Sequence, residues 1–196
     1  MRIAVIGTGN IGGAIGRAWA RAGHAVTFGS RHPDDLDVAG DTGASVAGVQ
    51  DALDGAEVVL LALPSRAVDE FLASHWNAID GTLVIDATNR VGAPVMNASE
   101  QIAAAAPRAR YVRAFNSLGW ENFAEPVFDG SAADLFFSAA AADRDTVEGL
   151  IADIGLRPAY LGENQYQVVD SVASLWFALV RARGGNRHVA LRVLER

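Results

Sequence analysis

The chain has 196 residues, of which 51% are hydrophobic and 20% charged, an ordinary composition for a globular domain with a well-buried core. Its formal net charge of −7 disfavours nucleic-acid binding, because contacts with nucleic-acid phosphates need a basic surface. The absence of cysteine and lysine excludes thiol nucleophiles, disulfides, cysteine–zinc sites and Schiff-base chemistry. No apolar run approaches the ~18 residues of a membrane span and MRIAVIG is too short for a signal peptide, so we expect a soluble cytoplasmic protein without a membrane partner.

The predicted elements alternate along the chain between short apolar strands and helices. Strands are expected at residues 3–6, 25–28, 44–46, 57–63, 82–86, 110–115, 134–139 and 157–161. Helices are expected at residues 10–22, 49–53, 66–72, 99–106, 143–154 and 165–183, with Ser99 as an N-cap and a polar loop at 30–43. This alternation is typical of the α/β class and predicts one doubly wound, Rossmann-type parallel sheet with helices on both faces. We expect a single domain over residues 1–196, with a C-terminal helical segment at about 164–196 packing on it.

A glycine-rich motif follows the first expected strand and opens the first helix, which is the context that a dinucleotide-binding loop requires. Gly7 permits the tight turn, Gly9 lets the backbone approach a pyrophosphate, and Gly12 permits close packing of helix on strand. The N–H groups of this loop are therefore predicted to bind phosphates. The alternative is a plain strand–helix turn. The predicted loop consists of Gly7, Thr8, Gly9, Asn10, Ile11 and Gly12.

The end of the second strand indicates which dinucleotide binds. NAD or FAD enzymes usually carry an acidic residue there for the ribose hydroxyls, whereas this chain has Ser30, Arg31 and His32. A guanidinium can pair with the 2′-phosphate of NADP, which a carboxylate would repel. NADP(H) is therefore the predicted cofactor, with a further contact from the Ser30 hydroxyl. The alternative is that Arg31 is a solvated loop residue and that Asp34 or Asp35 serves the ribose.

Other strand ends are expected to line the same cleft, because ligands of such sheets bind outside the carboxyl ends of the strands. Leu63 and Pro64 follow the fourth strand, Thr88 and Asn89 the fifth, and Asn116 the sixth. The three polar residues are candidates to meet the nicotinamide amide and the nearby ribose. For each of them, a turn in which the side chain bonds to nearby backbone is an equal alternative.

The chain offers few groups for proton transfer. Alcohol and hydroxy-acid dehydrogenases need a placed acid or base, and none of the four histidines is expected beside the nicotinamide. His24 is expected in a tight turn, His32 at the adenine end, His75 in a loop after a surface helix and His188 in the tail. We therefore predict no catalytic side chain and no metal site. This inventory suits a small-molecule redox partner that accepts a hydride without a protein proton donor.

Only 35 residues follow the last expected strand, so the partner site has to come from loops, the C-terminal helix and a second subunit. Trp120 and Trp176 are the aromatic side chains best placed to cover a planar ligand. Core packing is the favoured alternative for Trp176 and an equal one for Trp120. Residues 181–196 carry a local charge of +4, from five arginines and Glu195, which either steers an anionic ligand or is a solvated helix end.

Six segments together resemble the coenzyme F420-dependent NADP reductase family, also called F420H2:NADP oxidoreductases, through most of the chain. They are VIGTGNIGGAIG, GSR after the second strand, VVLLALP, VIDATN, VRAFNSLGWENF and LRPAYLG. The GSR and AFN-x-x-GWENF segments are the most specific. The chain departs from archaeal members in its first loop and in AFNSLGWENF, and it is more similar to a bacterial branch. The domain type is also similar to the cytosolic part of membrane ferric reductases, where a flavin accepts the hydride.

The resemblance implies a compact NADP-binding Rossmann domain, a homodimer, and hydride transfer between NADP(H) and a deazaflavin or flavin-like acceptor such as coenzyme F420. It implies that Ser30, Arg31 and His32 hold the NADP phosphate. The implied acceptor site includes Asn116, Leu118, Trp120 and Trp176. Two alternatives stay open: an NADPH-dependent reductase of a small carbonyl or imine, and a non-catalytic NADP(H)-binding redox sensor.

Overall fold

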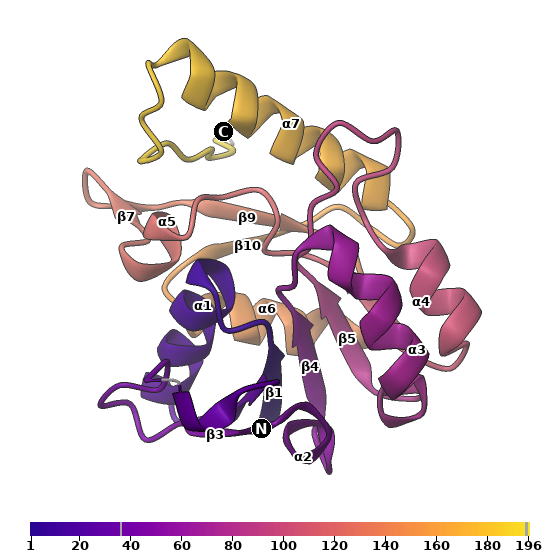
Figure 1. The fold of residues 1–196 in the computed structure, drawn as a ribbon. Helices are drawn as coiled ribbons and strands as arrows, with labels where there is room; N and C mark the ends of the chain where they lie inside the picture. Colours follow the sequence, from indigo (N-terminus) through magenta and orange to yellow (C-terminus); the bar gives the residue numbers. More distant parts are fainter. Residues whose placement is uncertain (36, 195) are drawn as a thin grey trace.

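The computed structural model describes residues 1–35, 37–194 and 196, whose largest sheet has six parallel strands (Figure 1). These strands are β1 (Arg2–Ile6), β2 (Ala25–Ser30), β3 (Ser45–Gly48), β4 (Val58–Leu61), β5 (Leu83–Asp86) and β6 (Arg110–Arg113). The helices are α1 (Asn10–Arg21), α2 (Val49–Leu53), α3 (Val68–Ile79), α4 (Ser99–Ala105), α5 (Glu121–Ala124), α6 (Arg144–Ala152) and α7 (Tyr166–Ala182). Short 3₁₀ turns are η1 (Pro33–Asp35), η2 (Ser65–Ala67) and η3 (Ala141–Asp143). The α/β class and the Rossmann-type sheet predicted from the sequence are confirmed.

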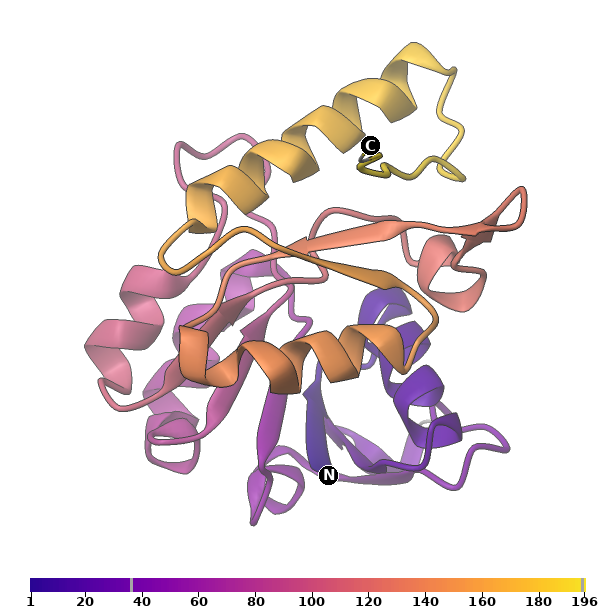
Figure 2. The same ribbon diagram turned by 180° about the vertical axis from the view of Figure 1, so that it is seen from behind.

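The sheet is covered on both faces, because its central strands are buried at consecutive positions: Ile3–Ile6 of β1 and all residues of β4 and β5. Ile3 and Val5 of β1 pack toward α1 and α6, while Ala4 and Ile6 pack toward α2, α3 and α4. Successive side chains of a strand point to opposite faces, so a run of buried residues fills two cores at once. Figure 2 shows α6 lying across the face that is turned away in Figure 1.

The strand order, β3-β2-β1-β4-β5-β6, positions the site. The chain leaves β1 toward β2 on one side and returns to β4 on the other. The loops after β1 and β4 therefore diverge at the point where the order reverses. In open parallel sheets this switch point forms a crevice outside the carboxyl ends of the strands.

The last two predicted strands form a separate sheet, which corrects the expectation of one sheet. Strands β9 (Asp134–Phe137) and β10 (Arg157–Tyr160) pair with each other in parallel, and Ser138, the residue after β9, forms an isolated antiparallel bridge with Arg113 of β6. The connection from β6 to β9, residues 114–133, contains only the single-turn helix α5 and a small hairpin, β7 (Val127–Phe128) and β8 (Ser131–Ala132). No long crossover helix returns the chain to the starting edge of the sheet, which a parallel pairing of β6 and β9 would require.

Two helix boundaries also differ from the sequence prediction. Helix α3 runs to Ile79 instead of ending at residue 72, because no helix-breaking residue occurs before Asp80 and Gly81. Ser99 is the first residue of α4 and not its N-cap. Its N–H and hydroxyl both donate to the Asn97 side chain, at 3.1 and 2.6 Å.

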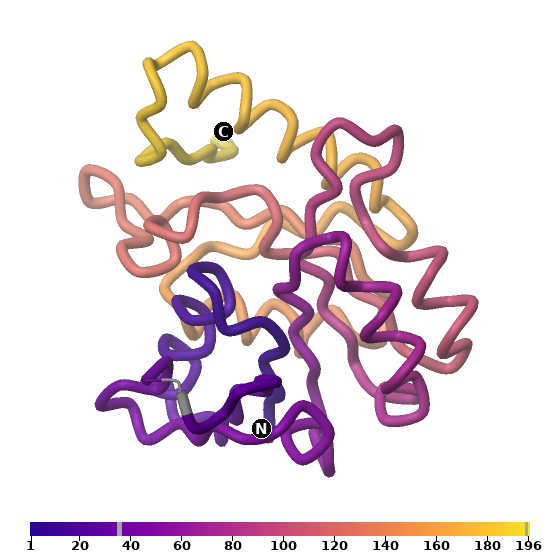
Figure 3. The backbone as a smooth tube through the Cα atoms, viewed as in Figure 1, coloured from indigo at the N-terminus to yellow at the C-terminus, as the bar shows by residue number. Residues whose placement is uncertain are grey.

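The C-terminal helix α7 lies along the edge of the molecule, beyond β9, and the tail after it turns back beneath the helix (Figure 3). The tail runs beside β9, where the Asp134 N–H donates to Leu191 O at 2.9 Å. The Trp176 indole N–H of α7 donates to Val189 O at 2.7 Å, so the helix and the tail hold each other in place.

Candidate functional site

A crevice of about 650 Å³ opens at the switch point between β1 and β4. The glycine-rich loop forms one wall, the end of β2 a second, and η2 with the first turns of α3 a third. Its lining residues are Ile6, Gly7, Thr8, Gly9, Asn10, Ile11, Gly29, Ser30, Arg31, Val49, Ala62, Leu63, Pro64, Arg66, Ala67, Glu70, Phe71, Ser74 and His75.

Two glycines of the loop are required by the fold. Gly7 has φ +107°, and a Cβ there would lie 2.4 Å from the Ala62 carbonyl oxygen. A Cβ on Gly12 would lie 1.9 Å from the Gly7 carbonyl oxygen and 3.1 Å from Val5 Cγ1. Real Cβ atoms do not approach backbone this closely, so larger residues at either position would force the loop and the helix apart.

Gly9 is different from its two neighbours. It has φ −75° and ψ −168°, an extended conformation open to any residue, and a Cβ there would have no atom within 4 Å. Nothing in the described chain therefore requires glycine at this position. Because the residue lies on the crevice at the N-terminus of α1, the missing side chain leaves room for a molecule outside the chain.

The end of β2 presents a hydroxyl and a guanidinium to the crevice. The Ser30 hydroxyl accepts the His32 backbone N–H at 3.0 Å, and the His32 side chain is not part of the crevice lining. Arg31 is exposed, and its side chain has no hydrogen bond or ion pair with any described residue. Asp34 lies outside the lining, and the Asp35 side chain lies outside the described part of the chain.

One face of η2 and α3 supplies crevice residues that the sequence analysis did not select. Arg66, Glu70 and His75 lie on this wall, together with Ala67, Phe71 and Ser74. His75 was expected in a loop, but it is a helical residue whose Nδ1 lies 3.1 Å from Gln50 Oε1. Gln50 comes two residues after Gly48, the register partner of Ser30, so His75 lies at the β2 end of the crevice. The recurrence of these residues at three- and four-residue intervals was the signal that could have found them.

Thr88, Asn89 and Asn116 lie outside this crevice lining, around a buried arginine. Arg113 has 0% exposure, and its guanidinium donates four hydrogen bonds: from Nε to Asp170 Oδ1 at 2.7 Å, from Nη1 to the Asp86 and Thr88 carbonyls at 3.0 and 2.6 Å, and from Nη2 to Asn89 Oδ1 at 2.9 Å. Its Nη2 also lies 2.7 Å from Asp170 Oδ1 in an ion pair.

Asp86 is the second charged group of this cluster. Its Oδ1 accepts the Thr88 N–H and hydroxyl at 2.8 and 2.6 Å, and its Oδ2 accepts the Ala98 N–H at 2.8 Å and the Tyr111 hydroxyl at 2.7 Å. Burial, reinforced by the Asp86 charge, raises the pKa of Tyr111 well above its usual value of 10.0, so its hydroxyl stays a donor. The Thr88 hydroxyl is therefore already committed to the Asp86 carboxylate, and not to nearby backbone as the turn alternative expected.

The two asparagines differ in what they leave free. The Asn89 side chain is used at both ends, since its Nδ2 donates to the Asn116 carbonyl at 2.7 Å and its Oδ1 accepts from Arg113. Asn116 Nδ2 donates weakly to Asp170 Oδ1 at 3.4 Å, while its Oδ1 is buried without a hydrogen bond to any described residue. Asn116 therefore keeps an acceptor that a ligand amide could use.

The two tryptophans and Leu118 complete the list of expected site residues. Trp176 is 2% exposed and packs in the core, as the favoured alternative for it predicted. Leu118 is buried beside the same core, whereas Trp120 is 36% exposed at the start of α5.

In the described part of the chain, no group of three His, Asp or Glu side chains could hold a metal ion, and no helix is long and apolar enough to span a membrane.

Comparison with known proteins finds a family that resembles the part of the chain containing this crevice. Residues 2–90 match the family described as NADP oxidoreductase, coenzyme F420-dependent. A crystal structure from Arthrobacter sp. FB24, described as a candidate F420-dependent NADP-reductase, is similar over 100% of both chains, with TM-score 0.85 and 24% identity. A reductive aminase from Aspergillus terreus, solved with NADPH, is similar in fold over 94% of this chain and 62% of its own, with TM-score 0.73 and 21% identity.

A curated relative also matches. The glycerol-3-phosphate dehydrogenase [NAD(P)+] of Pseudomonas fluorescens (strain Pf0-1) is 29% identical over 126 residues, which are 55% of this chain and 35% of the relative. The chain thus spans about a third of the length of that enzyme. The matched family and these relatives are NAD(P)-dependent oxidoreductases, and the matched segment contains the loop, Ser30, Arg31 and Pro64. The resemblance to the coenzyme F420-dependent NADP oxidoreductase family, read from the sequence, is thereby confirmed, with the family match over residues 2–90 and the likeness in fold over the whole chain.

Proposed function

We propose that the chain binds NADP(H) in the crevice between β1 and β4 and exchanges a hydride with a deazaflavin or flavin-like acceptor, coenzyme F420 by preference. The observation that carries the proposal is Gly9, a glycine on the crevice wall that no contact within the described chain requires. A cradle that a Cβ would fill, at a helix N-terminus, fits a pyrophosphate.

The loop Gly7–Gly12 is assigned to the pyrophosphate, with Leu63 and Pro64 on the opposite side of the crevice. Ser30 and Arg31 are assigned to the 2′-phosphate, and the His32 N–H holds the Ser30 hydroxyl in place. Arg66 faces the same crevice and, like Arg31, has no side-chain partner among the described residues. Two free guanidinium groups against one carboxylate, Glu70, give the crevice a local positive balance on an otherwise acidic chain.

The nicotinamide end is assigned to the neighbouring exits of β5 and β6. Asn116 Oδ1 is a buried acceptor without a partner in the described chain, and a carboxamide N–H would satisfy it. Thr88 and Asn89 act as supports, because their side chains are already hydrogen-bonded to Asp86 and Arg113. Trp120 is assigned to cover the acceptor ring, with Leu118 and Trp176 as the apolar floor beneath it.

NADPH supplies the hydride; the chain contributes position and the exclusion of water. Glu70 and His75 are the acidic group and the histidine of the crevice lining, and His75 lies at the β2 end, where the 2′-phosphate is assigned. At the β5 and β6 exits, the carboxylates Asp86 and Asp170 are paired with Arg113, so no general acid is assigned beside the nicotinamide. A ring that accepts a hydride without a protein-supplied proton suits this arrangement better than a ketone, whose reduction needs a placed acid.

The second candidate is reduction of a small carbonyl or imine. The similarity in fold to an NADPH-bound reductive aminase favours testing it, although this chain spans only 62% of that protein. The third is a sensor that binds NADP(H) without turnover.

The test compares acceptors at a fixed NADPH concentration: coenzyme F420, riboflavin, a cyclic imine and a small ketone. We expect the fastest NADPH oxidation with F420. Turnover of the imine or ketone without turnover of F420 would replace the proposal by the second candidate. NADPH binding without oxidation by any acceptor, across a range of pH, would support the sensor.

We also propose that residues 1–196 act as one NADP-binding unit and that the chain is a homodimer. Two contacts support the first point, because Asp170 of α7 pairs with Arg113 of β6 and Trp176 packs in the main core. The redox partner is a small molecule in this account.

A further inference from the structure

Helix α7 carries two parallel rows of apolar side chains, and its own chain covers only one of them. The inner row includes Val169, Ala173 and Trp176, which are 0%, 0% and 2% exposed. The outer row consists of Val168, Val172, Leu175 and Leu179, of which Val168 is 46% and Leu175 49% exposed and the other two are half-buried. Both views of the ribbon show α7 at the edge of the molecule, with no element on its outer side (Figures 1 and 2).

The outer side of α7 also lacks the charges of an ordinary surface helix. Residues 171–180 read SVASLWFALV and contain no charged side chain over almost three turns. A helix that faces water on one side normally places charged residues there. An uncharged row of aliphatic side chains at intervals of four, three and four residues is the pattern with which two helices pack together.

We propose that the outer row of α7 is a homodimer contact, packed antiparallel against the same row of a second copy of this chain. The proposal rests on the homodimer proposed above and is independent of the cofactor. A two-fold axis makes the contacts reciprocal: where one residue of a copy meets a second residue of the partner, that second residue meets the partner's first. The intervals of four, three and four allow this because they read the same in both directions. With the axis between residues 173 and 174, Val168 lies opposite the partner's Leu179, and Val172 lies opposite the partner's Leu175.

Size and charge both favour the antiparallel direction. In the antiparallel pair, each contact between the two rows joins one valine to one leucine. A parallel pair would instead place leucine on leucine and valine on valine. Arg181 and Arg183, at the C-terminal end of α7, are exposed and have no side-chain partner in the described part of the chain. A parallel arrangement would bring these arginines against their own copies.

The N-terminal end of α7 offers the complementary charge. A recess of about 290 Å³ lies there between α4 and α7, lined by Val95, Asn97, Ser99, Glu100 and residues 164–168. Glu100 is the charged side chain of this lining. The exposed Glu163 directly precedes the lining segment 164–168 in the chain. In the antiparallel pair the arginines of each copy approach this acidic end of the other, which also opposes the two helix dipoles.

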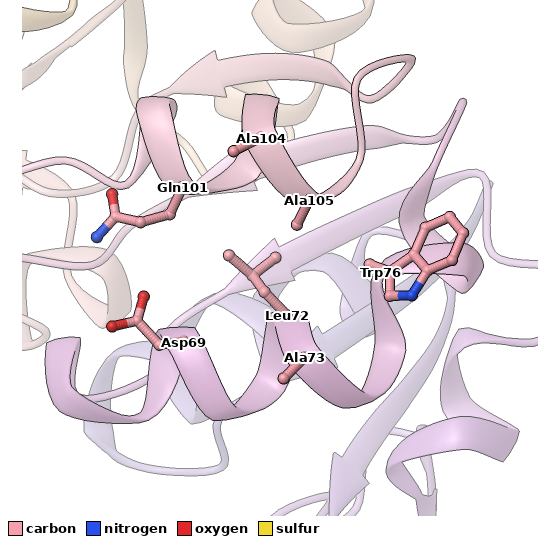
Figure 4. A pocket seen from close by; sticks show the side chains of 7 residues that line it. All are labelled: Asp69, Leu72, Ala73, Trp76, Gln101, Ala104 and Ala105. Atoms are coloured by element: carbon pink, nitrogen blue, oxygen red, sulfur yellow. The ribbon is translucent and has the colours of Figure 1, made fainter.

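A second hollow provides the matched control. A groove of about 510 Å³ between α3 and α4 is lined by Asp69, Leu72, Ala73, Trp76, Gln101, Ala104 and Ala105 (Figure 4). Trp76 at its rim is 47% exposed, close to the value for Leu175, and it also lies on a helix. The groove offers one large exposed side chain and no row that repeats along a helix, so it is not chosen as the contact.

The first experiment measures sedimentation equilibrium of the full chain and of two variants. We expect the wild type and Trp76→Asp to be dimers, and Leu175→Asp to raise the dimer dissociation constant by roughly 100-fold or more, because a buried unpaired charge is costly. Circular dichroism and NADPH binding are measured on the same samples. A monomeric wild type, an unchanged Leu175→Asp dimer, or dissociation by Trp76→Asp instead would each overturn the proposal.

The second experiment tests the direction, using a chain that contains no cysteine of its own. Val168→Cys and Leu179→Cys proteins are oxidised separately and as a mixture. In the antiparallel pair like positions lie about 16 Å apart, too far for a disulfide, so only the mixture should cross-link. Cross-linking of each variant alone would contradict the antiparallel contact. Loss of NADPH binding in an intact dimer would contradict the proposed function and leave this contact standing.

Discussion

At the scale of single residues, the three motif glycines fall into two kinds: Gly7 and Gly12 are required by the fold itself, whereas Gly9 leaves room for a ligand. A Cβ on Gly7 or Gly12 would lie only 2.4 or 1.9 Å from a backbone oxygen, whereas a Cβ on Gly9 would face open space. The motif and its position after a strand predicted all three roles from sequence alone. What the sequence could not show is which glycine the chain itself requires, because that depends on the distance between loops far apart in the sequence.

Gly9→Val provides the corresponding prediction. The extended backbone at this position suits a β-branched residue, so the melting temperature should stay within a few degrees of wild type. NADPH binding should fall by about 100-fold or more, since the side chain fills the space assigned to the pyrophosphate. Isothermal calorimetry and thermal unfolding measure both quantities. Gly12→Ala is the control, because it should lower the melting temperature itself, and normal NADPH affinity in Gly9→Val would remove the loop as a phosphate cradle.

Arg113 and His75 mark the limit of prediction at this scale. The sequence RYVR gives no sign that its second arginine is fully buried, because its partner Asp170 lies 57 residues away. His75 was assigned to a loop because the helix was ended too early at residue 72. Ser30 and Arg31, by contrast, lie on the crevice lining where the motif rule expected them, since their place follows directly from the end of a strand.

At the scale of elements, one buried charge cluster joins β5, β6 and α7. Arg113 is the cation, Asp86 of β5 and Asp170 of α7 are the carboxylates, and the cluster therefore carries one net negative charge. The arginine also bonds the backbone of Thr88, so it fixes the loop at the nicotinamide end of the proposed site. The position of α7 relative to the sheet thus depends on this cluster as well as on apolar packing.

Arg113→Met should destabilise the chain by about 3–5 kcal/mol, because it leaves two buried carboxylates without their cation. Urea denaturation at neutral pH measures this free energy of unfolding. Adding Asp170→Asn to Arg113→Met should recover part of the loss, since one of the two uncompensated charges is then gone. A cost below about 1 kcal/mol for Arg113→Met would contradict the role given to the cluster.

A second contact between elements ties α5 to the C-terminal tail and predicts a pH dependence. Partial burial by itself raises the pKa of Glu121, but the Arg187 hydrogen bond at 2.7 Å, a backbone hydrogen bond and the nearby positive charge together outweigh it, and the net pKa lies below the usual 4.5. A lowered pKa means that the pair stabilises the fold above the usual value and that this contribution is lost as the pH falls through the lowered one.

Glu121→Gln should therefore lower the free energy of unfolding by about 0.5–1 kcal/mol at pH 7, a small amount because Arg187 is partly solvated. At an acidic pH below the lowered pKa of Glu121, the difference from wild type should vanish. Glu125→Gln, an exposed neighbour without an ion pair in the described chain, is the control and should have no effect at either pH. Equal destabilisation by Glu121→Gln at both pH values would show that the charge of Glu121 is not the cause.

At the scale of the whole molecule, the alternation of strands and helices was enough to predict the main sheet but not the second one. Strands 134–139 and 157–161 were placed correctly in the sequence, yet they pair with each other instead of extending the sheet. Periodicity identifies an element and its buried faces, whereas pairing depends on the length and path of connections such as residues 114–133. The apolar outer row of α7 was likewise visible in the sequence, but only the structure separates it from the covered inner row.

Charge acts at this scale too. The chain has a net charge of −7, yet the crevice lining carries Arg31 and Arg66 against Glu70. An anionic dinucleotide is thus repelled by the molecule at long range and attracted at the crevice. Salt screens both effects beyond about 8 Å at physiological ionic strength. The short-range contact with Arg31 should therefore dominate the choice between NADPH and NADH under those conditions.

The most direct test of the account is calorimetric titration of the wild type and Arg31→Ala with NADPH and with NADH. A charge-assisted pair with the 2′-phosphate is worth about 1.5–3 kcal/mol, so Arg31→Ala should weaken NADPH binding by roughly 10- to 150-fold. NADH lacks the 2′-phosphate, and its affinity should hardly change. An equal loss for both dinucleotides, or no loss for NADPH, would contradict the assignment of this crevice to NADP(H).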